Sequence, residues 1–338
     1  MIPLAVREVR PEGEGAVSLA FDAPEGWTFE PGQYLTIRRP GTAARRSYSI
    51  ACAPGEGLRI GVRRVPGGEV SGWAQGLGPG DVVEAMAPDG RFTWRGERDV
   101  LLVAAGSGIT PMVSIASAVL GAGGRATLVY GNRGLSTVMF RDALGALKDR
   151  HLGRFRVVHV MSREAQDMPM LNGRVDGAKL RELAGAGLID PSADAAFVCG
   201  PGGMIDDAGA ALRGMGMPEG RIRAERFTQA GEAPRPPSRE ARAAAEGGVA
   251  VEVVLDGARR AFEMRGGTVL EAAEAAGLDL PWSCRGGMCC TCRCRVREGA
   301  SEMAVNFSLE PWEVEAGYTL ACQTRPVGGK LVLDFDAA

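Results

Sequence analysis

The spacing of apolar and polar positions changes twice along the chain. Residues 1–96 contain short strand-like runs broken by frequent Gly and Pro, without a convincing helical period. This pattern is typical of a small antiparallel β-barrel. Residues 97–227 instead alternate apolar strand-like runs with helix-like stretches. Strands interleaved with helices predict a parallel, doubly wound sheet, so we expect an α/β domain here.

The clearest strand-to-helix transition in the middle segment is DVLLVAAGSGITP, which begins at Asp99. It predicts a buried strand, a Gly-rich turn, and a helix with Thr110 as its cap and Pro111 at the first helical position. Further strands are predicted at ATLVYGN, FRVVHVM and AAFVCGP. Ligands bind sheets of this kind at the carboxyl ends of the strands, so the turns that follow these runs are candidate site segments.

Residues 249–338 show a third pattern. VAVEVVLDG and RRAFEM are strand-like runs around an Asp256-Gly257 turn, which predicts a hairpin. Thr268 and Glu271 form a capping box ahead of a short helix, and LVLDFD is a last strand. Hairpin, helix, cysteine loop and strand in this order predict an α+β module of the β-grasp type.

A polar segment, TQAGEAPRPPSREARAAAEGG at residues 228–248, separates the second and third patterns. It is rich in Pro, Ala, Gly and charge and has few large apolar side chains, so it is interpreted as a linker and not as a core element. The chain is therefore predicted to be multidomain, with domains at residues 1–96, 97–227 and 249–338.

Five of the eight cysteines lie in CRGGMCCTCRC, residues 284–294. The spacing Cys284-x4-Cys289-x2-Cys292, followed after 29 intervening residues by Cys322, is that of a plant-type [2Fe–2S] ferredoxin. Such a cluster takes three thiolates from one tight loop and a fourth from a distant element. The two glycines in the loop let the backbone curl and aim N–H groups at cluster sulfurs. We expect these four cysteines to bind the iron.

Other metal centres fit the cysteines less well. Zinc sites usually have two C-x2–4-C pairs, and the second pair is missing, although zinc stays an alternative. A Rieske centre needs histidine ligands, and neither His151 nor His159 is near a cysteine pair. Cys290 is expected to be an inert neighbour of a ligand, with competition for iron or oxidation as the other outcomes.

The composition limits the class of protein, its partners and its location. Apolar residues make up 45% and charged residues 24%, as in a soluble globular protein with a substantial core. The formal net charge of −2 gives a nucleic-acid partner no electrostatic support. No apolar run reaches 18 residues and the start lacks the layout of a signal peptide, so we expect no membrane span and a cytoplasmic location. In a reducing compartment, clustered cysteines are more often metal ligands or redox groups than disulfides.

Two short motifs in the barrel segment could bind a ring and a phosphate. In RRSYS, Arg46 and Tyr48 share one face of a strand, so a cation and an aromatic ring would face the same ligand. GGEVS could offer a cradle of backbone N–H groups and the Ser71 hydroxyl to an anion. Taken separately, the two motifs could equally be an exposed barrel strand and a hairpin turn.

Two strand ends in the α/β segment carry further candidates. The turn from Gly106 to Thr110 opens a helix, and its backbone N–H groups suit a pyrophosphate. A Gly-rich turn of this kind is by itself a weak indication, because many such turns bind nothing. Cys199 ends another strand, where a cysteine is by default a small buried hydrophobe.

Taken in order, RRSYS, GGEVS, GSGITP and VCGPGGM resemble the signatures of the ferredoxin–NADP reductase superfamily of flavin oxidoreductases, followed by a plant-type ferredoxin domain. The resemblance spans essentially the whole chain. More narrowly, RRVPGGEVSGWA, YGNR, LNGRVDGAKL and NFSLEPWEVEAGYTLACQ are similar to the reductase components of phenylacetyl-CoA ring epoxidases. That resemblance implies FAD, a [2Fe–2S] cluster, and electron transfer from NADPH to a di-iron oxygenase.

The resemblance implies a role for each barrel motif. The RRSYS residues would hold the flavin, with the arginine on phosphate and the tyrosine against the ring system. These residues are Arg46, Tyr48 and Ser49. The GGEVS residues would line the FAD pyrophosphate through backbone N–H groups and the serine hydroxyl. These are Gly68, Val70 and Ser71.

The resemblance also places the nicotinamide nucleotide. Three residues of the Gly-rich turn would face it, namely Gly106, Gly108 and Thr110. Cys199 and Gly200 would lie beside the nicotinamide, so Ser49 and Cys199 are the expected catalytic contacts. Ser162 and Arg163 would contact the ribose 2′-phosphate, which favours NADPH and leaves NADH possible.

The implied activity is hydride transfer from the nicotinamide to the flavin, followed by single-electron steps to the cluster and delivery to an oxygenase. Two alternatives stay open. A reductase of the same architecture could serve a Rieske oxygenase or a steroid or alkylamine hydroxylase. The chain could also be a non-enzymatic iron–sulfur or zinc module fused to a degenerate nucleotide-binding domain.

Overall fold

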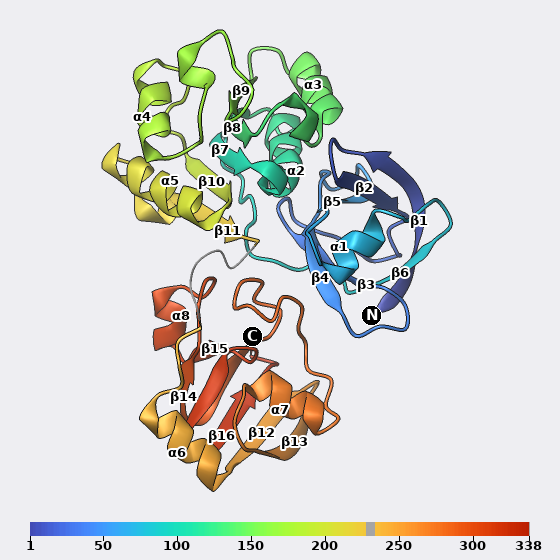
Figure 1. Cartoon of the computed structure of the whole chain (residues 1–338), viewed down its shortest axis with the longest axis vertical. Coiled ribbons are helices and arrows are strands. Elements are labelled where there is room, and N and C mark those ends of the chain that lie inside the picture. The colour runs from blue at the N-terminus through green and yellow to red at the C-terminus, as the bar shows by residue number, and fades with distance from the viewer. Residues whose placement is uncertain (228–233, 338) are drawn as a thin grey trace. The chain divides into compact units, whose positions relative to one another are not determined.

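The computed structural model describes residues 1–227 and 234–337 and divides into two units, residues 1–230 and 231–338 (Figure 1). Both the predicted barrel and the predicted α/β domain lie in the first unit, and the cysteine-rich segment lies in the second. The boundary between residues 96 and 97 stays a prediction, because one unit contains both segments.

Six antiparallel strands make up the first part of the chain. They are β1 (Ile2–Pro11), β2 (Ala16–Phe21), β3 (Tyr34–Arg38), β4 (Arg45–Ser49), β5 (Leu58–Arg63) and β6 (Val82–Ala85). Their order in the sheet is β4-β3-β6-β1-β2-β5. The two edges of the sheet meet where Ile50 pairs with Ile60 and the Ala51 N–H donates to the Arg59 carbonyl over 2.7 Å. The strands therefore curl into the predicted barrel, which protects the edges that an open sheet would expose.

A short helix, α1 (Glu69–Ala74), lies within residues 1–96, where the sequence shows no convincing helical period. Its six residues are too few to show a helical period in the sequence. Val70 and Ala74, four positions apart, are both buried in the barrel core. Packing of this one pair against the barrel therefore stabilises a helix that local propensity does not predict.

The α/β part of the first unit is a five-stranded parallel sheet in the order β11-β10-β7-β8-β9. Its strands are β7 (Asp99–Ala105), β8 (Arg125–Asn132), β9 (Phe155–Met161), β10 (Ala195–Gly200) and β11 (Ile222–Arg226). Its helices are α2 (Ile109–Gly121), α3 (Arg141–Arg150), α4 (Gly177–Gly185) and α5 (Gly202–Gly214). The strands predicted at ATLVYGN, FRVVHVM and AAFVCGP are confirmed.

Both faces of this sheet are buried, as the continuous apolar runs of its strands require. On β7, Leu102 packs into the core made with α2 and α3, and Leu101 packs into the core made with α4 and α5. Figure 1 shows the two helix pairs on opposite sides of the sheet. The helices do not cover the carboxyl ends of the strands. The turns that follow these ends contain the residues predicted to bind the nucleotide.

Hydrogen bonds join the barrel to the α/β sheet within the first unit. Arg223 of β11 pairs with Glu97, and its Nη1 donates to the Thr93 carbonyl over 2.9 Å. The Phe140 N–H donates to Glu12 Oε2 over 2.9 Å, and the Ser114 hydroxyl donates to the Cys52 carbonyl over 2.6 Å. These bonds fix the α/β sheet and its helices against the barrel.

The second unit is a mixed sheet in the order β13-β12-β16-β14-β15, in which β12 and β16 are parallel and the other pairs are antiparallel. Its strands are β12 (Val249–Leu255), β13 (Ala258–Met264), β14 (Arg293–Met303), β15 (Tyr318–Leu320) and β16 (Thr324–Asp334). Its helices are α6 (Arg239–Gly247), α7 (Val269–Ala275) and α8 (Pro311–Glu315).

Two predictions for this unit are confirmed. The hairpin turn between β12 and β13 has a positive φ at Asp256 (54°) and at Gly257 (72°), as a two-residue turn of this hand requires. The capping box is present, since Thr268 accepts from the Glu271 N–H and Glu271 accepts from the Thr268 N–H.

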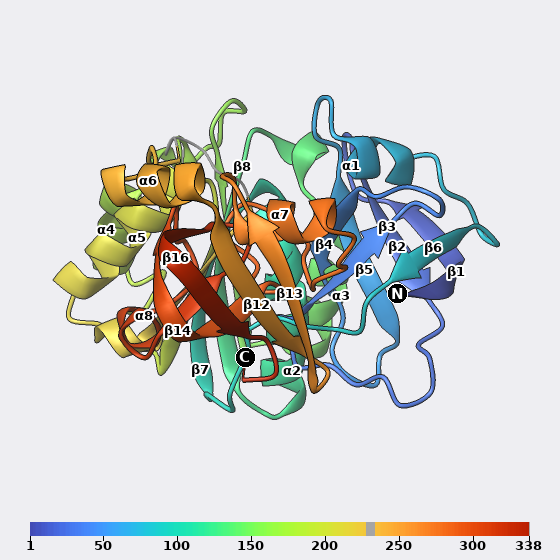
Figure 2. The same ribbon diagram turned by 90° about the horizontal axis from the view of Figure 1, so that it is seen from below.

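The prediction that residues 228–248 form a linker without core contacts is wrong for residues 239–247. These residues form α6, which begins at an N-cap made by Ser238 and buries Ala241 beside β16 (Figure 2). The helix is rich in Ala, so it packs closely while carrying no large apolar side chain that would mark it as a core element. Residues 228–233 of the predicted linker lie outside the described residues.

Candidate functional site

The Gly-rich turn of the α/β sheet lies directly against the end of β10. Gly106 has a φ of 55°, and the turn runs from Gly106 to Gly108 into α2. A Cβ on Gly108 would stand 2.1 Å from the Cys199 carbonyl oxygen and 3.0 Å from the Gly200 nitrogen. Only glycine permits this approach. The structure thus brings together two motifs that lie far apart in the sequence.

Thr110 is not the cap of α2, contrary to the sequence prediction. The helix begins at Ile109 with Gly108 as its N-cap, and the Thr110 hydroxyl donates to the Ser107 carbonyl over 2.8 Å. The 3-10 turn leads straight into the helix, so the helix starts one residue before Thr110. The hydroxyl therefore braces the turn, whose backbone N–H groups stay directed away from the helix.

Two buried side chains, Ser49 and Cys199, meet the half-buried Glu225, whose Oε2 atom is buried, where the barrel adjoins the α/β sheet. Cys199 pairs in register with Glu225 of β11, and the Ser49 hydroxyl at the end of β4 lies close enough to Glu225 to affect its pKa. Ser49 is 3% exposed and Cys199 is fully buried. Ser49 Oγ and Glu225 Oε2 have no hydrogen-bond partner of normal geometry among the described residues. Buried polar atoms of this kind are normally satisfied, so they fit a bound group with hydrogen-bonding atoms.

These side chains are electrically neutral near pH 7. Burial raises the pKa of Glu225 to about 8, and contact with Ser49 offsets only part of that rise. Burial and the nearby Glu225 carboxyl also raise the pKa of the Cys199 thiol. A carboxyl that keeps its proton can donate a hydrogen bond, whereas a carboxylate would repel the electron pair of an arriving hydride.

The RRSYS segment forms β4, and alternation along it places Arg46 and Tyr48 on one face. Arg46 is exposed, and Tyr48 is half-buried against the barrel core. Burial raises the pKa of the Tyr48 hydroxyl, which therefore stays protonated. A cation and a flat ring on one face fit the phosphate and ring system of a flavin.

The GGEVS segment is the start of α1. Gly68 is the N-cap, and the Ser71 hydroxyl accepts from the Val65 N–H over 3.1 Å and donates to the Gly68 carbonyl over 3.3 Å. The side chain of Val70 lies in the barrel core. The Gly68 N–H donates to the Val65 carbonyl over 2.9 Å, so it is not offered to a ligand, and the Ser71 hydroxyl shapes the turn. The backbone N–H groups of Val70 and Ser71 stay candidates for the predicted pyrophosphate contact.

Ser162 and Arg163 follow β9 and lie beside the residues that follow β8. The Ser162 N–H donates to the Asn132 carbonyl and the Arg163 N–H to the Arg133 carbonyl, both over 2.9 Å. Arg133 and Arg163 are exposed. Asn132 is buried, and its amide has no hydrogen-bond partner of normal geometry in the described part of the chain. Two guanidinium groups and an amide at the end of a parallel sheet suit a phosphorylated ribose.

The four predicted cluster cysteines come together in the second unit as two pairs. A hydrogen bond from the Cys289 thiol lowers the pKa of Cys284, and the same contact raises the pKa of Cys289. Likewise, Cys292 donates to Cys322, which lowers the pKa of Cys322 and raises that of Cys292. The pairs also interact with one another, through Cys289 with Cys292 and Cys284 with Cys322.

Two thiol pairs are the arrangement that a two-iron cluster needs, because each iron takes two protein thiolates. A single zinc ion would instead draw four ligands around one point. The pairing therefore fits the [2Fe–2S] prediction and not the zinc alternative.

The backbone of the cysteine loop curls through three left-handed residues, Arg285 (φ 53°), Gly287 (φ 72°) and Cys290 (φ 59°). This curl aims N–H groups at sulfur: the Gly286 N–H donates to Cys284 Sγ over 3.3 Å. Gln323 Nε2 donates to the Arg285 carbonyl over 3.0 Å and approaches Cys322 Sγ at 3.5 Å. Donors to the sulfurs stabilise the negative charge of bound thiolates.

The remaining cysteines have other surroundings. Cys290 is half-buried, and its thiol donates to the Ser308 hydroxyl over 3.1 Å. Cys294 is a fully buried residue of β14. Cys52 is buried in the barrel core, and its thiol donates to the Gly57 carbonyl over 3.2 Å.

Comparison with known proteins accounts for both units. Residues 102–209 match the oxidoreductase NAD-binding domain family, and residues 253–327 match the 2Fe-2S iron-sulfur cluster binding domain family. The chain is 40% identical to a component of the 1,2-phenylacetyl-CoA epoxidase of Escherichia coli, over 99% of this chain and 97% of that protein. It is 36% identical to the ferredoxin reductase component of 3-ketosteroid-9-alpha-monooxygenase of Rhodococcus rhodochrous, over 98% and 96%.

The chain belongs to the reductase components of multicomponent oxygenases. Phthalate dioxygenase reductase, described as modular for electron transfer from pyridine nucleotides to [2Fe–2S], shares the fold, with a TM-score of 0.62, 22% identity and coverage of 99% of this chain and 98% of that one. Members of this family are oxidoreductases that use FAD, NAD(P)H and a [2Fe–2S] cluster, which are the cofactors predicted from the sequence. No helix in the described parts of this reductase has the length and apolarity to cross a membrane.

Glu225 and Arg133 are candidate site residues of the reductase that sequence reasoning missed. Glu225 lies in IRAER, where a charged strand gives no indication that one carboxyl is buried. The register of β11 against β10 places it beside Cys199, and that register is a tertiary feature. Arg133 belongs to YGNR. Its position directly after a predicted strand could have marked it as a site residue.

The first prediction concerns the buried proton of Glu225. Its folded pKa (about 8) lies above the ordinary value of 4.5, so the stability it contributes is full below pH 4.5 and is lost as the pH rises to about 8. Glu225→Gln should remove this loss, on the order of a few kcal/mol, because the amide cannot ionise. Thermal unfolding of the reductase at pH 5, 7 and 9 measures it. Glu25→Gln, at an exposed carboxyl, is the control, and equal pH dependence in wild type and Glu225→Gln would contradict the assignment.

The second prediction concerns the thiol pairs. Cys322→Ala should abolish the visible absorbance of the cluster and most of the bound iron, because one iron loses a ligand. Cys290→Ala should keep both, since the Cys290 thiol donates to Ser308. Iron and sulfide content and absorbance spectra of the purified proteins check this. Full iron content in Cys322→Ala would disprove the proposed ligand set.

Proposed function

We propose that this reductase takes electrons from NADPH in its first unit and delivers them singly from the thiol-bound cluster of its second unit to a phenylacetyl-CoA epoxidase. The observation that carries the proposal is the presence in one chain of a neutral buried site at Ser49, Cys199 and Glu225 and of two thiol pairs. Flavin and cluster, when bound, supply the conversion between a two-electron donor and one-electron delivery.

The chain's own residues position the reacting rings. Arg46 and Tyr48 offer a cation and a ring on one face of β4, and the start of α1 offers backbone N–H groups. From the α/β sheet, the turn at Gly106–Gly108 and the end of β10 offer a site for the nucleotide. The buried thiol of Cys199 excludes water without adding charge.

Glu225 and Ser49 are the hydrogen-bond donors of this site. The carboxyl of Glu225 keeps its proton up to about pH 8, and the Ser49 hydroxyl lies next to it. Together they can present a hydrogen-bond donor to a ring whose charge changes on reduction, without placing a negative charge there. No separate general base is needed, because hydride transfer carries its own electrons.

NADPH is the preferred donor on electrostatic grounds. Arg133 and Arg163 are exposed on adjacent turns, and the buried Asn132 directly precedes Arg133. The 2′-phosphate of NADPH can accept hydrogen bonds from guanidinium groups that the ribose hydroxyl of NADH cannot use in the same way.

The choice of oxygenase rests on the likeness to the Escherichia coli epoxidase component over nearly the whole chain. The tail NFSLEPWEVEAGYTLACQ, one of the stretches that carries this likeness, forms α8 and β15 and supplies Cys322. A steroid monooxygenase is the second candidate partner, because the Rhodococcus relative matches nearly as much of the chain.

The third prediction separates the two nucleotides. Arg163→Ala should raise the KM for NADPH about tenfold or more, because a charge-assisted contact to phosphate is lost, and should leave the KM for NADH nearly unchanged. Steady-state ferricyanide reduction with each nucleotide measures the effect. Arg150→Ala removes an exposed arginine at the end of α3 and is the matched control. An equal rise for NADH and NADPH would contradict a 2′-phosphate contact.

The fourth prediction names the partner. The purified reductase with NADPH should support substrate turnover by the oxygenase component of phenylacetyl-CoA epoxidase and should not support 3-ketosteroid-9-alpha-monooxygenase at a comparable rate. Product formation with each oxygenase measures the preference. Ferricyanide reduction with no turnover of the epoxidase, or faster turnover of the steroid enzyme, would assign the reductase to another partner.

A further inference from the structure

Helix α8 of the second unit buries a charged side chain and exposes apolar ones, which is the reverse of an ordinary amphipathic helix. Glu313 is its one buried residue, with a side chain that is 0% exposed, whereas Trp312 is 57% exposed and Val314 is 42% exposed. Among residues 234–337, these are the large apolar side chains that the structure leaves exposed. Burying a carboxylate while exposing a tryptophan costs stability, so the orientation needs a cause and points to a use.

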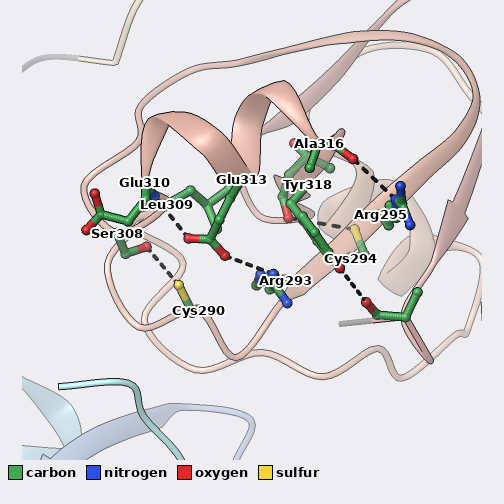
Figure 3. A network of polar contacts seen from close by, with 12 residues as sticks. Cys290, Arg293, Cys294, Arg295, Ser308, Leu309, Glu310, Glu313, Ala316 and Tyr318 are labelled. Carbon is green, nitrogen blue, oxygen red and sulfur yellow. Dashed lines mark hydrogen bonds and ion pairs between the residues drawn. The ribbon is translucent and has the colours of Figure 1, made fainter. Parts of the chain in front are cut away.

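The cause is a buried polar network around Glu313 (Figure 3). Glu313 Oε1 pairs with Arg293 Nη2 at 2.8 Å, and Oε2 accepts from the Glu310 N–H over 3.0 Å. The Arg293 guanidinium lies 3.6 Å from the centroid of the Tyr318 ring. An ion pair that is also hydrogen-bonded and stacked on a ring is held in one geometry. A pair of apolar side chains in its place would often give the fold equal stability, but it would not define the orientation of the helix as strictly. The network therefore fixes which side of α8 faces outward.

Two sets of contacts attach α8 to the cysteine loop. Ahead of the helix, the Ser308 hydroxyl donates to the Gly287 carbonyl over 3.1 Å and accepts from the Cys290 thiol. Within the helix, Glu313 pairs with Arg293, which directly follows Cys292 and whose N–H donates to the Cys290 carbonyl over 2.9 Å. The exposed tryptophan is thus held on a rigid extension of the loop that binds the cluster.

The charges beside the two apolar side chains are acidic. Glu310 and Glu315, which flank them on the helix, are both exposed. A partner that covers Trp312 and Val314 would therefore gain most affinity if it offers an apolar pocket rimmed by Lys or Arg. Tryptophan is among the side chains that most often dominate binding energy at such interfaces.

We propose that Trp312 and Val314, with the acidic rim of Glu310 and Glu315, are the surface by which the second unit docks to an external electron-accepting protein with a basic-rimmed apolar pocket. A separate protein must supply its own binding energy, whereas the first unit is covalently attached and meets the cluster at high effective concentration. An energetic anchor of this kind is therefore expected for the external partner. The inference rests on the proposed function only for the identity of that partner.

The fifth prediction tests this surface with two protein acceptors. Trp312→Ala should raise about tenfold the KM for cytochrome c, a basic one-electron acceptor, and the KM for the epoxidase oxygenase component. It should leave the rate of NADPH-driven cluster reduction in stopped-flow unchanged. Added salt should raise the KM for cytochrome c in the wild type, and less so in Glu315→Gln, because the acidic rim is weakened. Trp312→Phe should restore most of the affinity.

Leu152→Ala is the matched control, since it truncates a 76% exposed apolar side chain in the first unit and should change neither KM. Unchanged KM values in Trp312→Ala would overturn the proposal. Slower cluster reduction with unchanged acceptor KM would also overturn it and assign the surface to the first unit. If wild type fails to drive the epoxidase but Trp312→Ala still weakens the cytochrome c interaction, the surface stands and only the named oxygenase falls.

Discussion

The need to hold four thiolates in two pairs is the constraint from which most of the second unit follows. The loop must curl tightly enough to bring Cys284 to Cys289, and it does so through backbone conformations that are costly for residues other than glycine. Its partner Cys322 arrives from the turn between β15 and β16, so the sheet must bring distant segments together. Polar contacts that would be optional elsewhere, such as that of Gln323 to the Arg285 carbonyl, then fix the loop against the sheet. This rigidity suits a centre that exchanges electrons without rearranging.

The function proposed for the first unit sets a different requirement, which is to bring polar groups to a reacting ring without placing charge beside it. Burial serves this purpose, because desolvation disfavours the ionised forms of the Glu225 carboxyl and the Cys199 thiol. Arg46 and Arg163, the cations predicted to contact phosphates, are exposed to water. In the proposed function, neutral groups at the rings and cations at the phosphates would divide the tasks of reaction and binding.

Helix α8 shows how the two requirements of rigidity and recognition can meet. An ion pair buried at Glu313 and Arg293 is a weak source of stability but a strong source of orientation. Because Arg293 directly follows a cluster ligand, the outward direction of Trp312 is tied to the cluster loop itself. A docking residue placed in this way would bring a partner close to the cluster without a separate binding domain.

Local sequence determined the elements whose cause is local. The apolar runs predicted the parallel strands, Asp256-Gly257 predicted the hairpin, Thr268 with Glu271 predicted a helix start, and the cysteine spacing predicted which four cysteines come together, although not how they pair. Tertiary structure decided what depends on packing between distant segments. It made helices of residues 69–74 and 239–247, because burial of small apolar faces outweighed weak local preference, and it buried Glu225 and Glu313 through strand register and ion pairing. A sequence pattern records which residues prefer to be buried, whereas the partners that make a buried carboxyl tolerable come from elsewhere in the fold.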